Sequence, residues 1–192
     1  TNALIGKNSS GVDTQLWMAM TMLDSSRAKS VISKKLNCSS ADVKKMIIWG
    51  NHSPTMYPDV ENALVNNNPV GAIINDMNWV ENNFLPTVQQ RGKAVIDARG
   101  ASSATSAAKA ALDTIIACET PTEDGDCFSA AIASDGAYGV PEGLICGYPL
   151  ITMANGTVEI IRDVTLSEFA KTKFAISIDE LESEREAVKH LL

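Results

Sequence analysis

Short apolar runs and helical stripes alternate at the start of the chain. Residues 16–23, LWMAMTML, form a short apolar run whose length and abrupt end favour a buried strand, although the same run also fits a helix. Residues 44–50, KKMIIWG, predict a second buried strand. Asp24 is a candidate N-cap for a helix between them. The apolar positions of that helix fall on one face: Ala28, Val31, Ile32 and Leu36.

Two helices are predicted in the middle of the chain. Residues 84–99 place apolar side chains on one helical face and polar or charged ones on the other, and Gly100 is a natural stop. Residues 102–117, SSATSAAKAALDTIIA, are rich in small side chains, which favour a helix and also allow another backbone or a ligand to come close.

The second half predicts strands and then helices. Residues 127–134 and 144–154 are strand-like, and Asn155-Gly156 is a strong hairpin signal because both residues accept positive φ. TLSE (165–168) and SIDE (177–180) each match a capping box and predict helix starts. An apolar stripe follows on the last helix: Ile178, Leu181, Val188 and Leu191. This order of elements predicts one α+β domain.

Composition narrows the class of protein. The 192 residues are 45% hydrophobic and 20% charged, which suits one globular domain with its own core. A net charge of −7 argues against binding to nucleic acid or to an anionic membrane surface. No apolar run approaches the roughly 20 residues that span a bilayer, and no signal peptide is visible.

The cysteines suggest a compartment. Cys38, Cys118, Cys127 and Cys146 form no CxxC pair, and no histidine stands at ligand spacing from them. We therefore expect free thiols, no metal site and a reducing, cytoplasmic location.

His52 is the first candidate for chemistry. It is one of two histidines, and it follows the second predicted strand directly. An imidazole with an ordinary pKa of about 6.5 can act as a general base, although a structural role with both ring nitrogens satisfied is an open alternative. If the two predicted strands are neighbours, Asp24 emerges at the same edge and can hold the imidazole. The alternative for Asp24 is a plain N-cap.

Arg27 lies three residues after Asp24, on the same side of the predicted helix. Its guanidinium can grip a substrate carboxylate with two parallel hydrogen bonds, whereas the alternatives are a solvated arginine or an ion pair with Asp24. His190 and the carboxylates of residues 179–186 are expected on a solvated helix face. Glycine-rich nucleotide loops and the common hydrolase motifs are absent from the sequence.

Five stretches together carry a family resemblance. MLDSSRAKSVISKKLN (22–37) resembles the L-D-x-x-R-A segment of malate and lactate dehydrogenases. VKKMIIWGNHSPTMYPDV (43–60) resembles the I-I-W-G-N-H-S segment of the cytosolic-type malate dehydrogenases. Three further stretches resemble the same subgroup, in the same order along the chain: residues 88–110, residues 134–150 and the terminal helix. The resemblance covers essentially the whole chain.

The resemblance implies roles for named residues. His52 and Asp24 would be catalytic: His52 takes the proton of the C2 hydroxyl as hydride leaves for NAD, and Asp24 holds its ring. Arg27 would bind the C1 carboxylate, with Ser102 also on the substrate side. His52, Gly92 and Asn2 would be the cofactor-binding residues. Gly92 matches a family position that approaches the nicotinamide, and Asn2 belongs to TNALI, which resembles the tail of the family's N-P-x-N-T-N segment.

The sequence also departs from the family pattern. The family's first half is a Rossmann domain with a glycine-rich NAD loop, and no such loop is present here. The arginine that reads the far carboxylate of malate would also lie upstream. We therefore expect the family's C-terminal catalytic domain, an antiparallel sheet with long helices, over residues 16–192. Residues 1–15 would be the tail of the NAD-binding half.

The function implied is NAD-dependent oxidation of (S)-malate to oxaloacetate, a step of the tricarboxylic acid cycle, in a cytoplasmic homodimer. The 192 residues alone are expected to be inactive. The alternatives are an inactive fragment that serves as a binding or oligomerisation module, or a lactate-type 2-hydroxy-acid dehydrogenase. Chloroplast NADP-linked relatives fit less well, because they use cysteines in terminal extensions and none follows Cys146.

Overall fold

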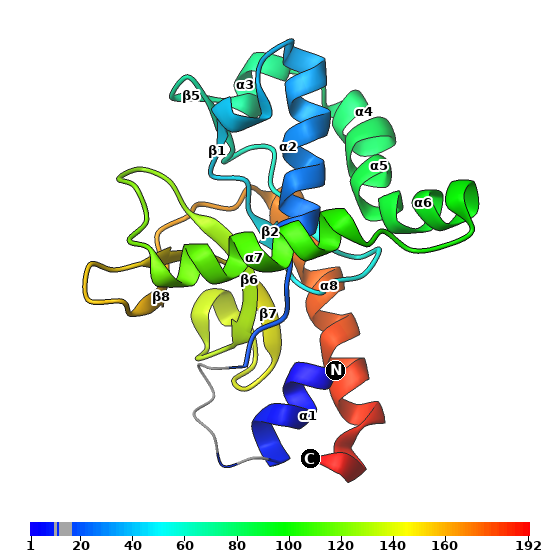
Figure 1. The fold of residues 1–192 in the computed structure, drawn as a ribbon, viewed down its shortest axis with the longest axis vertical. Helices are drawn as coiled ribbons and strands as arrows, with labels where there is room; N and C mark the ends of the chain where they lie inside the picture. Colours follow the sequence, from blue (N-terminus) through cyan, green and yellow to red (C-terminus); the bar gives the residue numbers. More distant parts are fainter. Residues whose placement is uncertain (10, 12–16) are drawn as a thin grey trace.

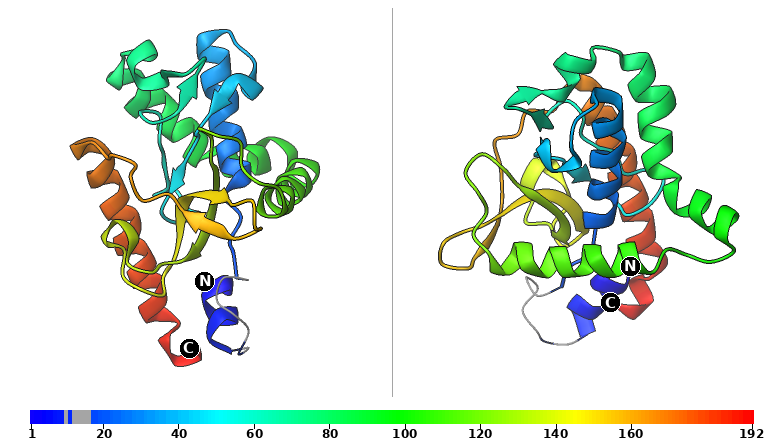
Figure 2. Two further views of the ribbon diagram at one scale, coloured as in Figure 1. Left: turned by 90° about the vertical axis from the view of Figure 1, so that its left-hand side faces the viewer. Right: turned by 45° about the horizontal axis from the view of Figure 1, so that its top comes forward.

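Long helices surround a small antiparallel sheet. The computed structural model describes residues 1–9, 11 and 17–192. Helix α7 (Thr105–Glu119) crosses one face of the sheet, helix α2 (Met22–Leu36) stands above it, and helix α8 (Glu168–Ala187) runs along its side (Figures 1 and 2). Helix α1 (Asn2–Ser9) lies beside the end of α8. The predicted α+β class, with antiparallel strands and long helices, is confirmed.

The sheet strands pair only with antiparallel neighbours in the described part of the chain. The main sheet has the order β6 (Phe128–Ala133), β7 (Ile145–Thr152), β8 (Val158–Ile160). Its β7–β8 connection confirms the predicted hairpin, because Gly156 has a φ of 83° and the Met153 N–H donates to the Thr157 carbonyl at 2.8 Å.

Two smaller sheets are also present among the described residues. One pairs β2 (Ile48–Trp49) with β3 (Tyr57–Pro58). The other has the order β1 (Val43–Lys44), β4 (Leu64–Val65), β5 (Asn68–Pro69). The predicted strand over residues 44–50 is therefore confirmed at β2, which directly precedes Gly50 and the His52 loop.

The helix predicted over residues 84–99 consists of two pieces. A π-helical turn, η3 (Val80–Phe84), leads into α5 (Leu85–Gln89), and α6 (Arg91–Arg99) follows at an angle (Figure 1). The backbone leaves helical geometry at Gln90, where φ is −99° and ψ is 3°. Gly100 ends α6 with a left-handed φ of 73°, as predicted. The remaining short helices are α3 (Val70–Ile74), α4 (Met77–Trp79), η2 (Ser40–Asp42), η4 (Ala137–Gly139) and η5 (Lys189–Leu191).

The strand predicted over residues 16–23 is wrong. Leu16 lies outside the described residues, and Ala19 makes only an isolated bridge to Ala131 of β6. Helix α2 already begins at Met22, because the helical spacing of its apolar positions extends back into the run. Thr21 occupies the N-cap position, so Asp24 lies inside the first turn of the helix instead of capping it.

The two predicted capping boxes have different outcomes. At the first, a helix does begin, but its N-cap is Ser167 and not Thr165, so TLSE forms no capping box; the Ser167 hydroxyl accepts a hydrogen bond from the Ala170 N–H. The second prediction, at residues 177–180, is wrong because α8 runs without interruption from Glu168 to Ala187. Ser177 is fully buried within that helix.

Trp49 links the sheets to α8. Its ring is fully buried and lies 4.7 Å from the ring of Tyr138 and 5.1 Å from that of Phe174, measured between centroids. The indole N–H donates to the buried Asp59 carboxylate at 3.0 Å, so its polar atom is satisfied. The strand that leads to His52 is therefore fixed in the core. None of the helices formed by the described residues is long and apolar enough to cross a membrane.

A close backbone contact joins the end of β2 to β7. The Gly147 N–H donates to the Gly50 carbonyl at 2.7 Å, and the Gly50 N–H donates back to the Gly147 carbonyl at 3.3 Å. A Cβ on Gly147 would lie 2.4 Å from the Ile48 carbonyl oxygen. Only glycine allows this approach.

Gly147→Ala should therefore lower the free energy of unfolding by at least about 2 kcal/mol, because the methyl group forces the two backbones apart. Gly92→Ala is the matched control, since a Cβ there meets nothing closer than 3.9 Å. Chemical denaturation of both variants measures the difference. Equal stability of the two variants would contradict the proposed contact.

Candidate active site

The first turn of α2 holds two charged side chains in a fixed place. The Thr21 hydroxyl donates to Ser129 Oγ of β6 at 3.1 Å, and Ser25 Oγ donates to the Met46 carbonyl at 2.9 Å. These bonds anchor the start of α2 to the sheet and to the segment before β2. Asp24 and Arg27, which extend from the same turn, are therefore placed by the core.

Asp24 and His52 meet, as predicted from the sequence. His52 Nδ1 lies 2.6 Å from Asp24 Oδ2, and the Asp24 side chain is fully buried while that of His52 is 52% exposed. The predicted reason was wrong: no pair of neighbouring strands brings them together. The first turn of α2 instead lies against the loop that follows β2.

The buried carboxylate changes the acidity of the imidazole. The hydrogen bond to Asp24 raises the pKa of His52, and this effect outweighs the opposing effects of partial burial and of the Arg27 charge. The charged imidazolium is therefore retained to a higher pH than for an ordinary histidine. Across the described residues, no hydrogen bond to Nε2 is present, so this nitrogen is available to a ligand.

Arg27 pairs with the same carboxylate. Its Nη1 donates to Asp24 Oδ1 at 3.2 Å, and its side chain is only 16% exposed. The ion-pair alternative is thus confirmed and the solvated-arginine alternative is wrong. Within the described part of the chain, Nη2 and Nε have no hydrogen-bond acceptor, which leaves them free for a carboxylate.

Gly92 lies beside Arg27. A Cβ built on Gly92, in the first turn of α6, would have Arg27 Nη1 as its nearest neighbour, at 3.9 Å. Neither its backbone conformation nor packing within the chain requires glycine, although glycine in a helix costs about 1 kcal/mol relative to alanine. A methyl group at this position would be in ordinary contact with the guanidinium.

Among the described residues, no hydrogen bond joins Ser102 or Asn2 to Asp24, Arg27 or His52. Ser102 is exposed in the connection between α6 and α7. Asn2 is exposed at the start of α1. Its neighbour Thr1 donates to Glu184 at 2.9 Å, and Asn51 donates to the other oxygen of the same carboxylate at 2.7 Å. The sequence neighbours of Asn2 and His52, Thr1 and Asn51, thus share the Glu184 carboxylate. The proposed contacts of Asn2 and Ser102 with a ligand stay a prediction.

The role of α8 at the site was not predicted from the sequence. The carboxylates of residues 179–186 were expected to be a solvated face, but Glu180 accepts hydrogen bonds from three residues around His52: Asn51, Ser53 and Thr55. Ser177, Glu180 and Glu184 share one helical face by their spacing, which is the signal that could have revealed it. His190 lies exposed in η5, away from the cluster.

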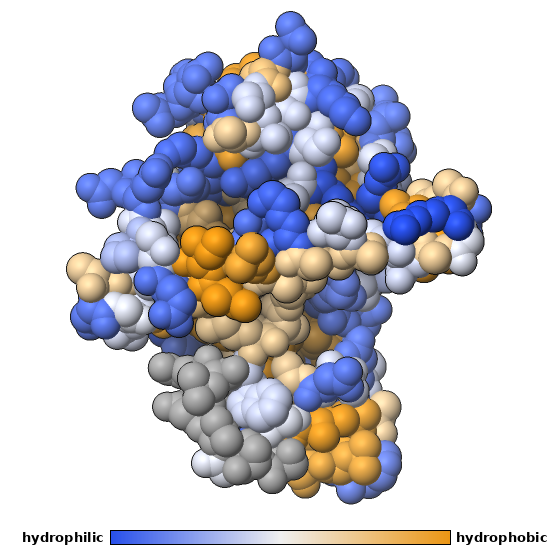
Figure 3. Space-filling view, viewed as in Figure 1, coloured by the Kyte–Doolittle hydropathy of each residue, from blue (hydrophilic) through white to orange (hydrophobic). Residues whose placement is uncertain are grey.

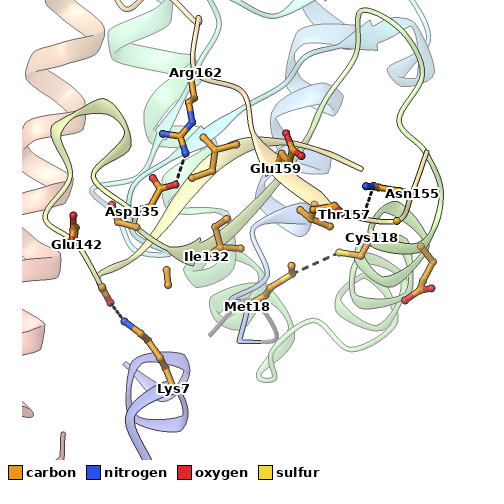
Figure 4. A pocket seen from close by; sticks show the side chains of 17 residues that line it. Lys7, Met18, Cys118, Ile132, Asp135, Glu142, Asn155, Thr157, Glu159 and Arg162 are labelled. Carbon is orange, nitrogen blue, oxygen red and sulfur yellow. Dashed lines mark hydrogen bonds and ion pairs between the residues drawn. The ribbon is translucent and has the colours of Figure 1, made fainter. Parts of the chain in front are cut away.

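A cavity of about 1060 Å³ lies elsewhere in the molecule (Figure 4). Its walls include an ion pair between Arg162 and Asp135 and a hydrogen bond of 3.3 Å from Lys7 Nζ to the Gly143 carbonyl. Asp24, Arg27 and His52 do not line it. Among residues 1–9, 11 and 17–192, no three His, Cys, Asp or Glu side chains are grouped to hold a metal ion.

Asp24→Asn should lower the pKa of His52, because the charged partner of the imidazolium is lost. The raised pKa in the native protein also means that protonated His52 stabilises the fold. That contribution is fully present below the ordinary pKa of 6.5 and is lost as the pH rises through the raised value. NMR titration measures the pKa of the His52 imidazole in the native protein and in Asp24→Asn. The His190→Gln variant assigns the two histidine signals. Equal midpoints would contradict this electrostatic coupling.

The chain is similar to known proteins of one family. A profile described as the lactate/malate dehydrogenase, alpha/beta C-terminal domain, matches residues 21–192. All 192 residues align with malate dehydrogenases of Magnetococcus marinus, at 48% identity, and Cutibacterium acnes, at 46%. The chain spans 59% and 58% of the lengths of these two curated relatives.

Solved structures share the fold. Malate dehydrogenase from Naegleria fowleri is 36% identical, with a TM-score of 0.91 over 100% of this chain and 58% of its own. Lactate dehydrogenase from Trichomonas vaginalis, solved in complex with NADH and oxamate, has a TM-score of 0.93 over 100% of this chain and 60% of its own. At 24% identity that second likeness supports the fold alone. The chain therefore belongs to the lactate/malate dehydrogenase family and carries its α/β C-terminal domain.

Proposed function

We propose that this chain is the substrate-binding and proton-transfer part of a malate dehydrogenase, which oxidises (S)-malate to oxaloacetate with NAD. The observation that carries the proposal is the contact of 2.6 Å between His52 Nδ1 and the buried Asp24 carboxylate, with Arg27 on the same helical turn. This arrangement joins a general base to a carboxylate-binding guanidinium.

In the proposed reaction, neutral His52 accepts the proton of the C2 hydroxyl at Nε2. Asp24 accepts the hydrogen bond from Nδ1–H and stabilises the imidazolium that forms. The C2 hydrogen leaves with its electron pair as hydride, and a carbonyl forms at C2. When bound, NAD supplies the hydride acceptor.

The raised pKa of His52 sets a direction for the pH dependence. Oxidation of malate needs neutral imidazole, so its rate should rise with pH through the His52 pKa. Reduction of oxaloacetate needs imidazolium, so its rate should fall over the same range. The hydrogen bond to Asp24 moves both transitions above the ordinary value.

Arg27 is proposed to bind the C1 carboxylate. Nη1 is occupied by Asp24, and Nη2 and Nε can donate two parallel hydrogen bonds to a carboxylate. Partial burial of the guanidinium strengthens this interaction relative to one in open water. Ser102 is proposed as a further substrate-side contact from the α6–α7 connection.

The residues present fit only the reacting end of a dinucleotide. Gly92, which lies beside Arg27, is proposed to approach the nicotinamide ring, and Asn2 and His52 complete the proposed cofactor side. The glycine-rich loop that binds the pyrophosphate is absent from this sequence. The remaining part of NAD would therefore be held by residues outside this chain. NAD is proposed over NADP on the family resemblance.

Malate is favoured over a lactate-type substrate because both curated relatives, at 48% and 46% identity, are malate dehydrogenases. The alternative of an inactive binding module is less favoured, because Asp24, Arg27 and His52 are all present and in contact.

A hybrid subunit tests this function. It joins the amino-terminal part of the Magnetococcus marinus enzyme to this chain, in place of the 59% that the chain spans. The hybrid should oxidise malate with NAD, and His52→Asn should lower kcat by about 10²–10⁴-fold because the proton acceptor is lost. NADH formation measures turnover. A hybrid that binds NADH but leaves malate unchanged would overturn the proposal, and lactate is the comparison substrate.

The 192-residue chain alone should show negligible malate oxidation, because its residues cannot hold the hydride acceptor against the substrate carbon. Intact mass must verify the polypeptide in this assay. Turnover by the verified chain would contradict this expectation.

We also propose a homodimer in the cytoplasm. Its support is the apolar face of α7, where Leu112, Ile115 and Ile116 are 56%, 61% and 50% exposed (Figure 3). Such patches commonly mark protein interfaces. The location is supported by the four cysteines, which are free thiols.

Ile115→Asp should shift the hybrid subunit from dimer toward monomer, because a charge cannot be buried unpaired at an interface. Light scattering coupled to size-exclusion chromatography measures the mass. Met153→Asp is the control, since Met153 is also exposed but lies at the β7–β8 hairpin. A dimer unaffected by Ile115→Asp would exclude this face.

A further inference from the structure

The loop that carries His52 contacts α8 on both sides of that residue. At its start, Gly50 has a φ of 87°, and a Cβ there would lie 2.1 Å from Ser177 Oγ of α8. The next residue, Asn51, donates its backbone N–H to the same Ser177 oxygen at 2.8 Å. Ser177 is fully buried, so this contact is a packed one.

A single oxygen of Glu180 gathers donors from both sides of His52. Asn51 Nδ2 donates to Glu180 Oε2 at 2.9 Å and Thr55 Oγ1 donates to it at 2.6 Å. The Ser53 hydroxyl also donates to this oxygen. Ser53 additionally accepts the Thr55 backbone N–H at 3.0 Å, which closes the loop on itself.

The charge of Glu180 makes these bonds stronger. Partial burial raises the pKa of the Glu180 carboxyl, but the hydrogen bonds from Ser53, Thr55 and Asn51 outweigh burial and hold the pKa below its ordinary value. The carboxylate is therefore ionised at neutral pH. Hydrogen bonds to an ionised acceptor are about twice as strong as neutral ones.

The loop side chains divide between two helices. Asn51, Ser53 and Thr55 reach α8, whereas His52 reaches Asp24 on α2. The position of the imidazole is thus fixed from two directions. Asp24 holds one ring nitrogen, and Glu180 holds the side chains of Asn51, Ser53 and Thr55 on either side of His52.

We infer that Glu180 is a positioning residue, which sets the place of His52 Nε2 by anchoring the flanking loop residues to α8. This inference rests on the proposed dehydrogenase function. Arg27 is held by α2 and not by Glu180. Loss of Glu180 should therefore impair proton transfer much more than substrate binding.

Kinetics of the hybrid subunit test this division. Glu180→Ala should lower kcat for malate by about 10–100-fold, because displacement of a catalytic group by about 1 Å has effects of that size. KM for malate should change less than about threefold, since Arg27 is untouched. Glu180→Gln keeps an acceptor oxygen at the same place, so it should restore much of kcat.

Glu182→Gln is the matched control on the same helix. Glu182 is exposed and pairs with Arg185 at 3.6 Å, away from the loop. Its kcat and KM should equal those of the parent hybrid. Thermal unfolding of each variant verifies that the variant is folded at the assay temperature. If Glu180→Ala is unfolded at that temperature, Glu180→Gln is the variant compared with the parent hybrid.

Hydrogen exchange separates failure of this inference from failure of the proposed function. The Asn51 and Thr55 amides should exchange faster in Glu180→Ala than in Glu182→Gln, whether or not the hybrid oxidises malate. Unchanged exchange would overturn the anchoring. Faster exchange with unchanged kcat would overturn the positioning role. A loss of kcat/KM that comes only from a raised KM would overturn it as well. A parent hybrid inactive toward malate would overturn the proposed function, on which the inference rests.

Discussion

The buried carboxylate of Asp24 is the constraint on which the site depends. A fully buried charge is tolerated only when it is paired and hydrogen-bonded, and Asp24 has two partners, His52 Nδ1 at 2.6 Å and Arg27 Nη1 at 3.2 Å. These partners are also the two groups proposed to meet the substrate. The requirement to neutralise one interior charge therefore assembles a base and a cation side by side.

The carboxylate can act in this way only because distant segments bring its partners to it. The start of α2 is tied to β6 through Thr21 and Ser129, and the end of β2 is tied to β7 through Gly50 and Gly147. Helix α8, from the far end of the sequence, then supports the loop between Gly50 and Thr55. The site is therefore built by the whole domain, although its charged residues lie within one short stretch of sequence.

The sequence predicted the elements that local patterns determine. The hairpin at Asn155-Gly156, the stop at Gly100 and the Asp24–His52 contact are all present. The apolar run before α2 misled the analysis, because a short run does not distinguish a strand from the beginning of a helix. The helix start predicted from SIDE was wrong because the Ser177 side chain does not cap a helix. It accepts a hydrogen bond from the Asn51 N–H of a distant loop. Glu180 escaped notice for the same reason: an acidic helix face looks solvated until its long-range partners are known.

The spacing of Asp24 and Arg27 on one helical turn has a consequence for how substrate preference can evolve. Since helix geometry fixes their separation, the proton relay and the carboxylate clamp cannot adapt to acids of different length. In the proposed reaction, variation in the substrate is therefore accommodated at its far end, beyond these residues.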